Sequence, residues 1–159
     1  MSRAFVKEDA QGPDEDPPER PLSSLPNYVT PRGLELYHRE EERLIAALAA
    51  YEGAQSDPVR RKEKRVLERD LRWVRARMES AIPVDPANQP KDQVRFGAAV
   101  VLRDAAGKER SVAVVGEDEA GGDKVTWASP FADAMLGLKA GDSFEFDGTR
   151  WTVVSLRYG

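Results

Sequence analysis

The chain has 159 residues, of which 40% are hydrophobic and 33% are charged, and its formal net charge at pH 7 is −4. This length suits one domain, or a small domain with an appendage, and the low apolar share places part of the chain outside the core. We expect no signal peptide, and no apolar run reaches the roughly 18 residues of a membrane helix. With no cysteine and one histidine, disulfides, zinc clusters and cysteine nucleophiles are excluded. A cytoplasmic protein without a cofactor of its own is therefore expected.

Acidic and basic residues are distributed unevenly along the chain. Residues 1–20 carry three basic and six acidic side chains, and residues 31–57 carry the same numbers. Residues 58–80 instead carry nine basic and four acidic side chains, a net charge of +5 in an otherwise acidic protein. The first 26 residues combine five prolines with many acids and few apolar groups, a composition that predicts a disordered tail.

Two helices are predicted after this tail. Thr30 and Pro31 suit the N-cap and the first position of one helix. Asp57 and Pro58 suit the same positions of a second, and Gly53 ends the first. Both helices carry side chains at alternating spacings of three and four, the seam of a coiled coil, with one polar exception at Glu41. The seams are Leu34, Tyr37, Glu41, Leu44, Leu48 and Tyr51 in the first helix and Leu67, Leu71, Val74, Met78 and Ala81 in the second.

Short strands follow a linker rich in proline and aspartate. They are predicted over Val94–Leu102, Arg110–Val115, Lys124–Trp127, Ser143–Phe146 and Trp151–Leu156. Ser129 and Pro130 open one short helix, Phe131–Leu138. The fold class is therefore α+β, an N-terminal antiparallel α-helical hairpin followed by a small antiparallel β domain with one short helix. The expected parts are a tail over 1–26, a hairpin over 27–82, a linker over 83–92 and a C-terminal domain over 93–159.

Motifs that carry chemistry are scarce. The sequence has no phosphate-binding loop, no nucleophile–base set and no metal-binding spacing. His38 lies on the polar side of the first predicted helix, where an ordinary surface residue is expected. The acidic run Glu117-Asp118-Glu119 before a Gly-Gly turn is typical of a solvated loop, with a metal site as the lesser alternative. No metal site is therefore predicted.

The second predicted helix carries a basic surface formed by Arg60, Arg61, Lys64, Arg65, Arg69 and Arg72. In one interpretation these cations pair with acidic residues of the first helix and of their own helix. In the other they bind phosphates or an acidic protein surface. The net charge of +5 slightly favours the second interpretation without identifying the partner.

Several short motifs occur in the order of a known family. They are Thr30-Pro31-Arg32-Gly33-Leu34, Phe96-Gly97-Ala98, Val115-Gly116-Glu117-Asp118-Glu119, Ser129-Pro130, Ala134-Met135-Leu136-Gly137 and Gly141-Asp142. With them, roughly residues 27–159 resemble the Gre family (GreA/GreB-like) of bacterial transcription elongation factors. The resemblance implies an FKBP-like C-terminal domain that docks at the rim of the RNA polymerase secondary channel, with the hairpin entering the channel.

The same resemblance implies where bacterial RNA polymerase is contacted, namely at the short helix and the acidic turn. The residues concerned are Ser129, Pro130, Phe131, Met135, Leu136, Glu117 and Asp118. Contact with RNA or DNA in the elongation complex is a further expectation, a membrane contact is not, and a monomer is favoured.

The predicted hairpin tip departs from the family. Cleavage factors of this family carry an acidic tip of the type Gly-Asp-x-x-Glu-Asn-Ala, whose two carboxylates help to hold a second magnesium ion at the polymerase active site. No such string occurs here, the arms are shorter, and the tip offers only Glu52 and Asp57. A surface residue and a helix cap are the simpler interpretations of these two. We therefore expect a regulator that acts by occupancy and has no catalytic residues of its own.

Two alternative functions stay open. The first is a true transcript-cleavage-stimulating factor that uses Glu52 and Asp57 at its tip. The second is a non-catalytic module that binds protein or nucleic acid through the basic second helix. Under each of them the chain is not an enzyme and at most stimulates the polymerase's own RNA cleavage.

Overall fold

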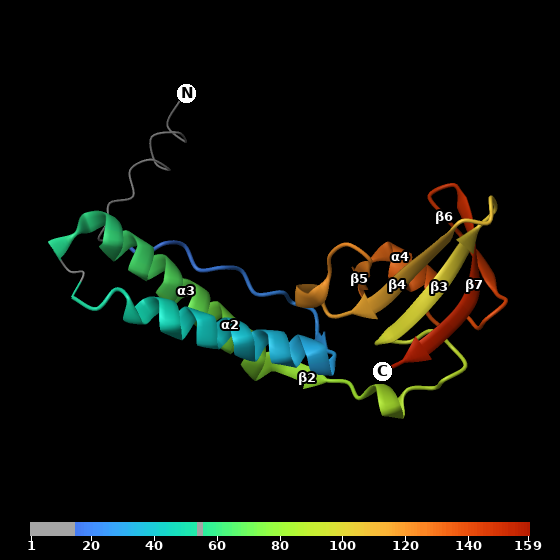
Figure 1. The fold of residues 1–159 in the computed structure, drawn as a ribbon, viewed down its shortest axis with the longest axis horizontal. Coiled ribbons are helices and arrows are strands. Elements are labelled where there is room, and N and C mark those ends of the chain that lie inside the picture. Colours follow the sequence, from blue (N-terminus) through green and yellow to red (C-terminus); the bar gives the residue numbers. More distant parts are fainter. Residues whose placement is uncertain (1–14, 54–55) are drawn as a thin grey trace, which may run out of the picture. The chain divides into compact units, whose positions relative to one another are not determined.

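The computed structural model describes residues 15–53 and 56–159 (Figure 1). The strands are β1 (Asn27–Val29), β2 (Ala81–Pro83), β3 (Ala98–Asp104), β4 (Glu109–Val115), β5 (Lys124–Thr126), β6 (Ser143–Phe146) and β7 (Thr149–Tyr158). The helices are α2 (Pro31–Ala49), α3 (Pro58–Ser80) and α4 (Pro130–Met135), with 3₁₀ turns at Pro86–Asn88 and Glu117–Glu119. Two compact units result: a helical unit of Leu36–Ser80 with the described residues up to Leu25, and a sheet unit of Pro26–Glu35 with Ala81–Gly159.

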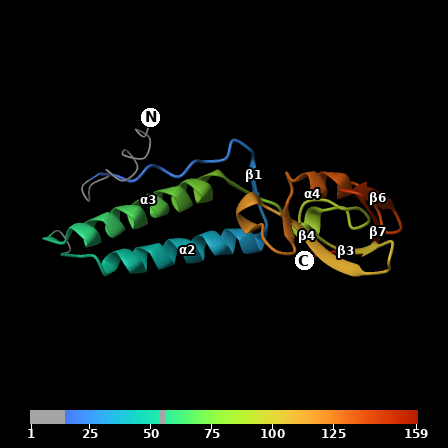
Figure 2. The same ribbon diagram turned by 90° about the horizontal axis from the view of Figure 1, so that it is seen from above.

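The helical unit is built on the predicted hairpin. The two helices lie side by side in perpendicular views (Figures 1 and 2). Leu44 and Val74 are at most 1% exposed and Tyr37 is 6% exposed, so three residues of the predicted seams form the apolar core of the hairpin. Burying a side chain of this size stabilises the folded state by about 1.5–3 kcal/mol. Near the turn the contacts become polar, since the Tyr51 hydroxyl donates to the Glu63 carboxylate at 2.7 Å.

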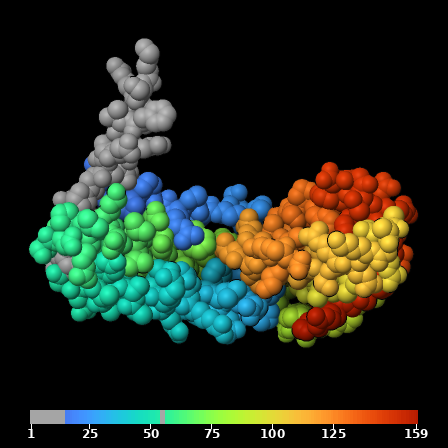
Figure 3. All heavy atoms as spheres, turned by 45° about the horizontal axis from the view of Figure 1, so that its top comes forward, coloured from blue at the N-terminus to red at the C-terminus, as the bar shows by residue number. Residues whose placement is uncertain are grey.

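Residues 15–25 run along α3 without regular secondary structure, and we call this segment the strap. The space-filling view shows the strap, in blue, against α3, in green (Figure 3). The structure differs here from the sequence-based expectation of a disordered tail. Residues 1–14 of that tail lie outside the described residues, whereas the strap is held to α3 by ion pairs.

A two-stranded parallel sheet, β1 with β2, brings together residues far apart in the sequence. Asn27 pairs with Ala81 and Val29 with Pro83. The sequence places Ala81 in the helical seam, but α3 ends one residue earlier, at Ser80. Pro83 disfavours helical geometry at Ile82, the residue before it, so the helix has to end ahead of this pair. Lacking an N–H, Pro83 sits at the last pair of this ladder.

The C-terminal sheet has the strand order β5-β4-β3-β7-β6. Its pairs are antiparallel except for β4 with β5, which is parallel. Ala98, Val100 and Leu102 alternate along β3 and are at most 1% exposed, which is the period of two expected of a strand with one buried face. Ala132 and Met135 of α4 are fully buried in the same core. The short helix therefore covers this face of the sheet.

The α+β class, with a helical hairpin followed by a mostly antiparallel sheet and one short helix, is confirmed. The first strand of the sheet begins at Ala98 and not at Val94, because Gly97 has a φ of +89° and breaks the extended run. Val94 instead exchanges backbone hydrogen bonds with Gly137 and Leu138, both at 2.8 Å. The same Gly137, with a φ of +86°, ends α4 before the predicted Leu138.

Candidate functional site

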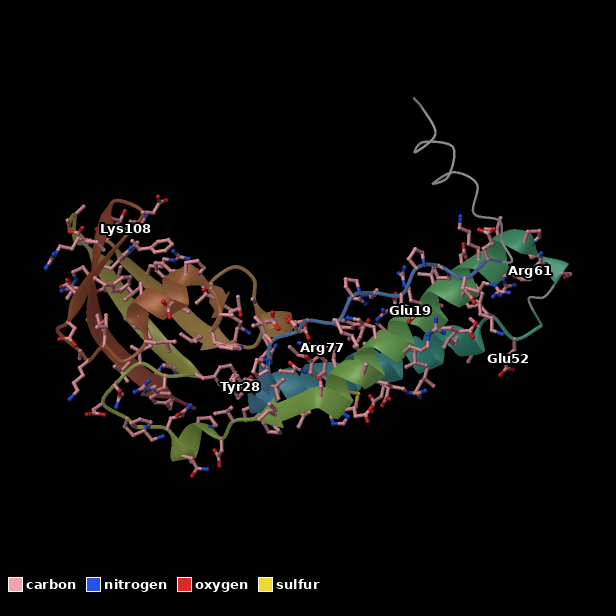
Figure 4. The ribbon with its side chains drawn as sticks, turned by 180° about the vertical axis from the view of Figure 1, so that it is seen from behind. Glu19, Tyr28, Glu52, Arg61, Arg77 and Lys108 are labelled. Carbon is pink, nitrogen blue, oxygen red and sulfur yellow. The ribbon has the colours of Figure 1, made fainter. Side chains whose placement is uncertain are left out.

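The two predicted tip carboxylates have different environments. Asp57 Oδ1 accepts hydrogen bonds from the backbone N–H groups of Val59 at 3.0 Å and Arg60 at 3.4 Å, so that Asp57 caps α3. Glu52 is exposed and projects from the tip (Figure 4). Nowhere in residues 15–53 and 56–159 do three or more acidic or histidine side chains come together as possible metal ligands. Within the described part of the tip, one carboxylate is therefore exposed to solvent and the other is engaged with the backbone.

Arg60, predicted as part of the basic surface, also helps to close the tip. Its guanidinium donates to the Ala50 carbonyl oxygen at 2.5 Å and lies 5.3 Å from the centre of the Tyr51 ring. The hydrogen bond to the Glu63 carboxylate raises the pKa of the Tyr51 hydroxyl above its usual value. These polar contacts of Arg60 and Tyr51 thus hold the tip together and have a structural role.

The predicted contact residues of α4 divide into exposed and buried ones. Ser129 Oγ accepts from the Ala132 backbone N–H at 3.1 Å, which makes Ser129 the N-cap of α4, and Pro130 is exposed at the first helical position. Leu136 is partly buried. Met135 is fully buried in the sheet core, which corrects the expectation that its side chain contacts a partner. Its role is to hold α4 in place from within.

Phe131 packs in an aromatic cluster beside α4. The centre of its ring lies 5.0 Å from that of Phe146, 5.8 Å from that of Phe144 and 6.3 Å from that of Trp151, all edge to face. The Arg110 guanidinium lies 5.4 Å from the Phe131 ring centre. Phe131, Phe146 and Trp151 contribute to an open pocket of about 350 Å³. A predicted contact residue therefore borders an aromatic hollow on the surface of the sheet unit.

A second pocket, of about 280 Å³, lies at the other end of α4, where Leu136 contributes to its wall. Tyr28 and Trp127 also line it, with their ring centres 5.1 Å apart and nearly perpendicular. Phe96 completes the aromatic part, with its ring centre 6.0 Å from that of Tyr28. This pocket belongs to the sheet unit alone.

Sequence-based reasoning missed the role of Glu119. Its carboxylate accepts hydrogen bonds from the backbone N–H groups of Thr30 at 3.1 Å and Gly116 at 3.2 Å, and from the Thr30 hydroxyl. The Thr30 hydroxyl oxygen in turn accepts from the Gly33 N–H at 3.0 Å. A negative charge at this position also interacts favourably with the dipole of α2. We call this arrangement the Glu119 clasp, and it joins the first turn of α2 to the turn after β4.

Two glycines make room for the Glu119 clasp. A Cβ atom on Gly33 would lie 2.4 Å from the Glu119 carboxyl carbon, and one on Gly116 would lie 2.4 Å from the Tyr28 carbonyl oxygen. Neither position therefore accepts alanine without displacing a neighbour. In the sequence, the Glu119 clasp corresponds to two short patterns, Thr30-x-x-Gly33 and Gly116-x-x-Glu119.

The other two acids of this turn are partner-contact predictions. Asp118 is exposed and Glu117 is partly buried. Of the predicted pair, Asp118 is thus the more exposed to solvent.

The predicted basic surface of α3 has several partners. Arg65 pairs with Asp16 of the strap at 2.7 Å, and Arg72 pairs with Glu19 of the strap at 2.5 Å. The hydrogen bond from Arg72 holds the pKa of Glu19 below its usual value, and the same bond raises the pKa of Arg72.

Pairing within the hairpin also occurs. Arg69 pairs with the adjacent Asp70 at 3.1 Å, and Arg75 pairs with Glu41 of α2 at 3.0 Å. Lys64 and Arg61 are partly buried. The basic surface is therefore divided between contacts inside the hairpin and contacts with the strap.

Comparison with known proteins places this arrangement in a class. Residues 89–158 match the model of the C-terminal region of the transcription elongation factors GreA and GreB. The transcription elongation factor GreB of Neisseria meningitidis serogroup A is 32% identical over 133 residues, covering 73% of this chain and 82% of that protein. The transcription elongation factor GreA of Nitratidesulfovibrio vulgaris strain DP4 is 31% identical over 125 residues, covering 74% of this chain and 73% of that protein. The chain belongs to the GreA/GreB family of transcription elongation factors.

One solved structure is a looser match. The transcription elongation factor GreA/GreB of Nitrosomonas europaea is 22% identical, with a TM-score of 0.42, covering 83% of this chain and 99% of that chain. A likeness at this level supports no argument about the site. Separately, none of the helices in the described part of the chain is long and apolar enough to cross a membrane.

Proposed function

We propose that this chain binds RNA polymerase and regulates transcript elongation by occupying the secondary channel, without strongly stimulating transcript cleavage. Membership of the family supports the partner, since the related proteins are transcription elongation factors. The tip supports the mode of action and carries the proposal. Asp57 caps α3 through Oδ1, so a metal ion held by Asp57 would either use the other carboxylate oxygen alone or break the cap of that helix.

Occupancy needs no reacting group on this chain. Metal-assisted RNA cleavage requires oxygen ligands that hold the ion beside the scissile bond. At the tip, Glu52 is exposed to solvent, whereas Asp57 caps α3 through the backbone. The effect on the polymerase would then come from the volume and the charge that the hairpin introduces.

The exposed surface around α4 is the proposed docking region. Pro130 is exposed, Phe131 borders the aromatic pocket, and Asp133 adds an exposed charge in the first turn. Asp118 adds a second exposed charge on the turn after β4. Protein–protein interfaces are enriched in aromatic residues and are surrounded by a polar rim.

The test is a titration of the full chain into backtracked elongation complexes, with binding and RNA cleavage measured together. We expect saturable binding, cleavage no faster than that of the polymerase alone, and competition with a cleavage-stimulating member of the family. If cleavage is stimulated, Glu52→Gln combined with Asp57→Asn decides between the mechanisms. Asparagine caps helices as well as aspartate does, so this variant removes the charges and keeps α3 intact. Cleavage lost in that variant would establish the carboxylate mechanism and overturn occupancy.

The docking surface is tested by Asp133→Lys, with Glu109→Lys as a matched control. Both substitutions make the same change of charge on an exposed residue of the sheet unit. Arg110 lies over Phe131, and successive strand residues face opposite ways, so Glu109 faces away from α4. We expect weaker binding to polymerase for Asp133→Lys alone. Equal affinities would rule out the α4 surface as the docking region.

A further inference from the structure

The strap and α3 carry opposite charges at matching spacings. Arg65 and Arg72 are seven residues apart, which is two helical turns and a rise of about 10 Å on one face of the helix. Their partners Asp16 and Glu19 are three residues apart, which also spans about 10 Å in an extended chain. Both ion pairs form at once, at 2.7 and 2.5 Å. The strap is therefore in register with the helix.

The contact at Glu19 has a defined geometry. Its carboxylate accepts from both Nε of Arg72 at 3.1 Å and Nη2 of Arg72 at 2.5 Å. Such two-point contacts between a guanidinium and a carboxylate add geometric specificity to the charge attraction. Figure 4 shows Glu19 on the strap beside α3. The α3 surface thus recognises the position of a carboxylate as well as its charge.

The next part of the strap reverses the charge. The Arg20 guanidinium lies 3.9 Å from the centre of the Trp73 ring and pairs with Asp70 at 3.5 Å. Trp73 Nε1 donates to the backbone carbonyl oxygen of Pro21 at 3.3 Å. A cation over an indole ring is attracted by the ring electrons. We call Arg65, Asp70, Arg72 and Trp73 together the α3 face.

The strap is held in a way that permits release. The side chains of Asp16 and Glu19 are 77% and 62% exposed in these ion pairs. Exposed ion pairs typically contribute less than about 1 kcal/mol each, and salt screens them. A competing segment with the same pattern of groups can therefore replace the strap.

We propose that the α3 face is a binding site for an extended acidic segment of another protein, and that the strap occupies this site until such a segment displaces it. The segment is defined by its chemistry: two carboxylates three residues apart, with a basic residue directly after the second. The site and its occupant both lie in the helical unit, so this proposal goes beyond the proposed function and does not depend on polymerase.

A polypeptide suits the α3 face better than a nucleic acid does. The Trp73 indole donates to a peptide carbonyl, a group that every extended polypeptide repeats. Asp70 accepts a cation here and would repel a phosphate. The strap meets both requirements, whereas a phosphate chain could accept from the indole but would place a negative charge beside Asp70.

The experiment uses a fluorescent synthetic peptide of residues 15–25, added to the full chain. The receptor is either wild type or Asp16→Asn with Glu19→Gln, which weakens the strap and leaves the α3 face intact. A tethered occupant acts at an effective concentration near the millimolar range, so we expect the peptide to bind the variant at least about tenfold more tightly than wild type. The control is Glu42→Gln with Glu79→Gln, which removes two exposed carboxylates outside the strap and should bind the peptide as wild type does.

The α3 face itself is tested in the variant with the weakened strap. Adding Arg72→Gln should abolish the gain in peptide affinity, while adding Lys62→Gln, which removes a charge from an exposed position of the same helix, should keep it. The indole N–H resonance of Trp73 gives a second readout. It should shift when the strap is weakened and return towards its wild-type position when the peptide binds.

Three results would overturn the proposal. The first is equal peptide affinity for wild type and the strap variant. The second is an equal loss of peptide affinity from Arg72→Gln and from Lys62→Gln, which would mean that the peptide is held by diffuse charge attraction. The third is a single-stranded RNA of the same charge binding the strap variant as tightly as the peptide, which would identify a nucleic-acid site.

Discussion

The Glu119 carboxylate accepts three hydrogen bonds, two from Thr30 at the start of α2 and one from the backbone N–H of Gly116 in its own turn. Glu119→Ala leaves those donors without this acceptor, so we expect the free energy of unfolding to fall by about 1.5–3 kcal/mol. Urea denaturation of the full chain measures the change. Glu145→Ala serves as the control, because the Glu145–Arg150 pair is exposed and its loss should cost less than about 1 kcal/mol.

The effect of Gly33→Ala on the free energy of unfolding should have opposite signs with and without the Glu119 side chain. In the wild-type chain the new Cβ atom would displace the Glu119 carboxylate and its hydrogen bonds, and we expect destabilisation. In the Glu119→Ala chain the obstacle is gone, and alanine should stabilise α2 by up to about 1 kcal/mol over glycine. The four chains form a double-mutant cycle measured by urea denaturation. Destabilisation of equal size in both backgrounds would contradict the contact between Gly33 and Glu119.

Glu19 predicts a pH dependence of the strap. Arg72 holds the pKa of Glu19 below its usual value, with Arg69 acting in the same direction and Asp16 opposing it. A carboxylate whose pKa is lowered by folding stabilises the folded arrangement above its unfolded pKa and loses that effect as pH falls through the folded pKa. We therefore expect the strap to stay on α3 at neutral pH and to detach at acidic pH below the usual glutamate range. The Trp73 indole resonance should follow this transition, and Glu19→Gln should remove the Glu19 part of it.

At the scale of elements, the start of α3 depends on one cap. Asp57→Ala removes the acceptor for the first N–H groups of the helix and should cost about 0.5–2 kcal/mol. Asp57→Asn keeps an acceptor oxygen and should be nearly neutral. Thermal unfolding of the two variants, followed by circular dichroism, makes the comparison. Equal stability of all three chains would mean that Asp57 is not a structural cap and would reopen its role at the tip.

Local signals were enough to predict most elements. Proline after a capping residue marks the starts of α2, α3 and α4, and alternation of apolar residues marks β3. The β1–β2 pair could not be predicted, because each strand has three residues and their pairing joins positions 54 apart, from Asn27 to Ala81. The start of β3 was predicted too early, because Gly97 looks like an ordinary residue of an apolar run until its positive φ is known.

Long-range contacts set the limit for the candidate site as well. The tip carboxylates, α4 and the basic helix were all found from the sequence, and the capping role of Asp57 agrees with its simpler interpretation. Met135 was placed on the contact surface because its motif is contiguous, whereas helical geometry turns it into the core. Glu119 escaped notice because its partner Thr30 lies 89 positions away.

At the scale of the whole molecule, added salt should affect the strap and leave the sheet unit unchanged. The strap is held by exposed ion pairs, and the Debye length falls from about 10 Å at 0.1 M salt to about 3 Å at 1 M. Trp127 instead packs among the rings of Tyr28 and its neighbours in the sheet unit. We expect the Trp73 indole resonance to move with added salt while that of Trp127 stays in place. Equal movement of both would indicate a general change in fold, not release of the strap.

The strap also shows what composition leaves out for residues 15–25. A disorder prediction weighs apolar area, and this segment has little of it to bury. Its order comes from carboxylates that match arginines some fifty positions later in the chain. A single sequence does not reveal such a match, because neither the acidic residues of the strap nor the arginines of α3 are unusual by themselves.

The pairing of the strap with α3 has a consequence for how mutations in the two segments would combine. Under the proposal above, losing the acidic residues at positions 16 and 19 would weaken the strap and leave the α3 face intact, so the variant would acquire a binding activity through the loss of two carboxylates. Losing Arg72 would abolish that activity, and combining the two changes would hide the effect of the first. Mutations in the strap and in the helix would thus have opposite effects on binding. Related proteins could gain or lose a partner through changes in the strap, without any change in the surface that binds it.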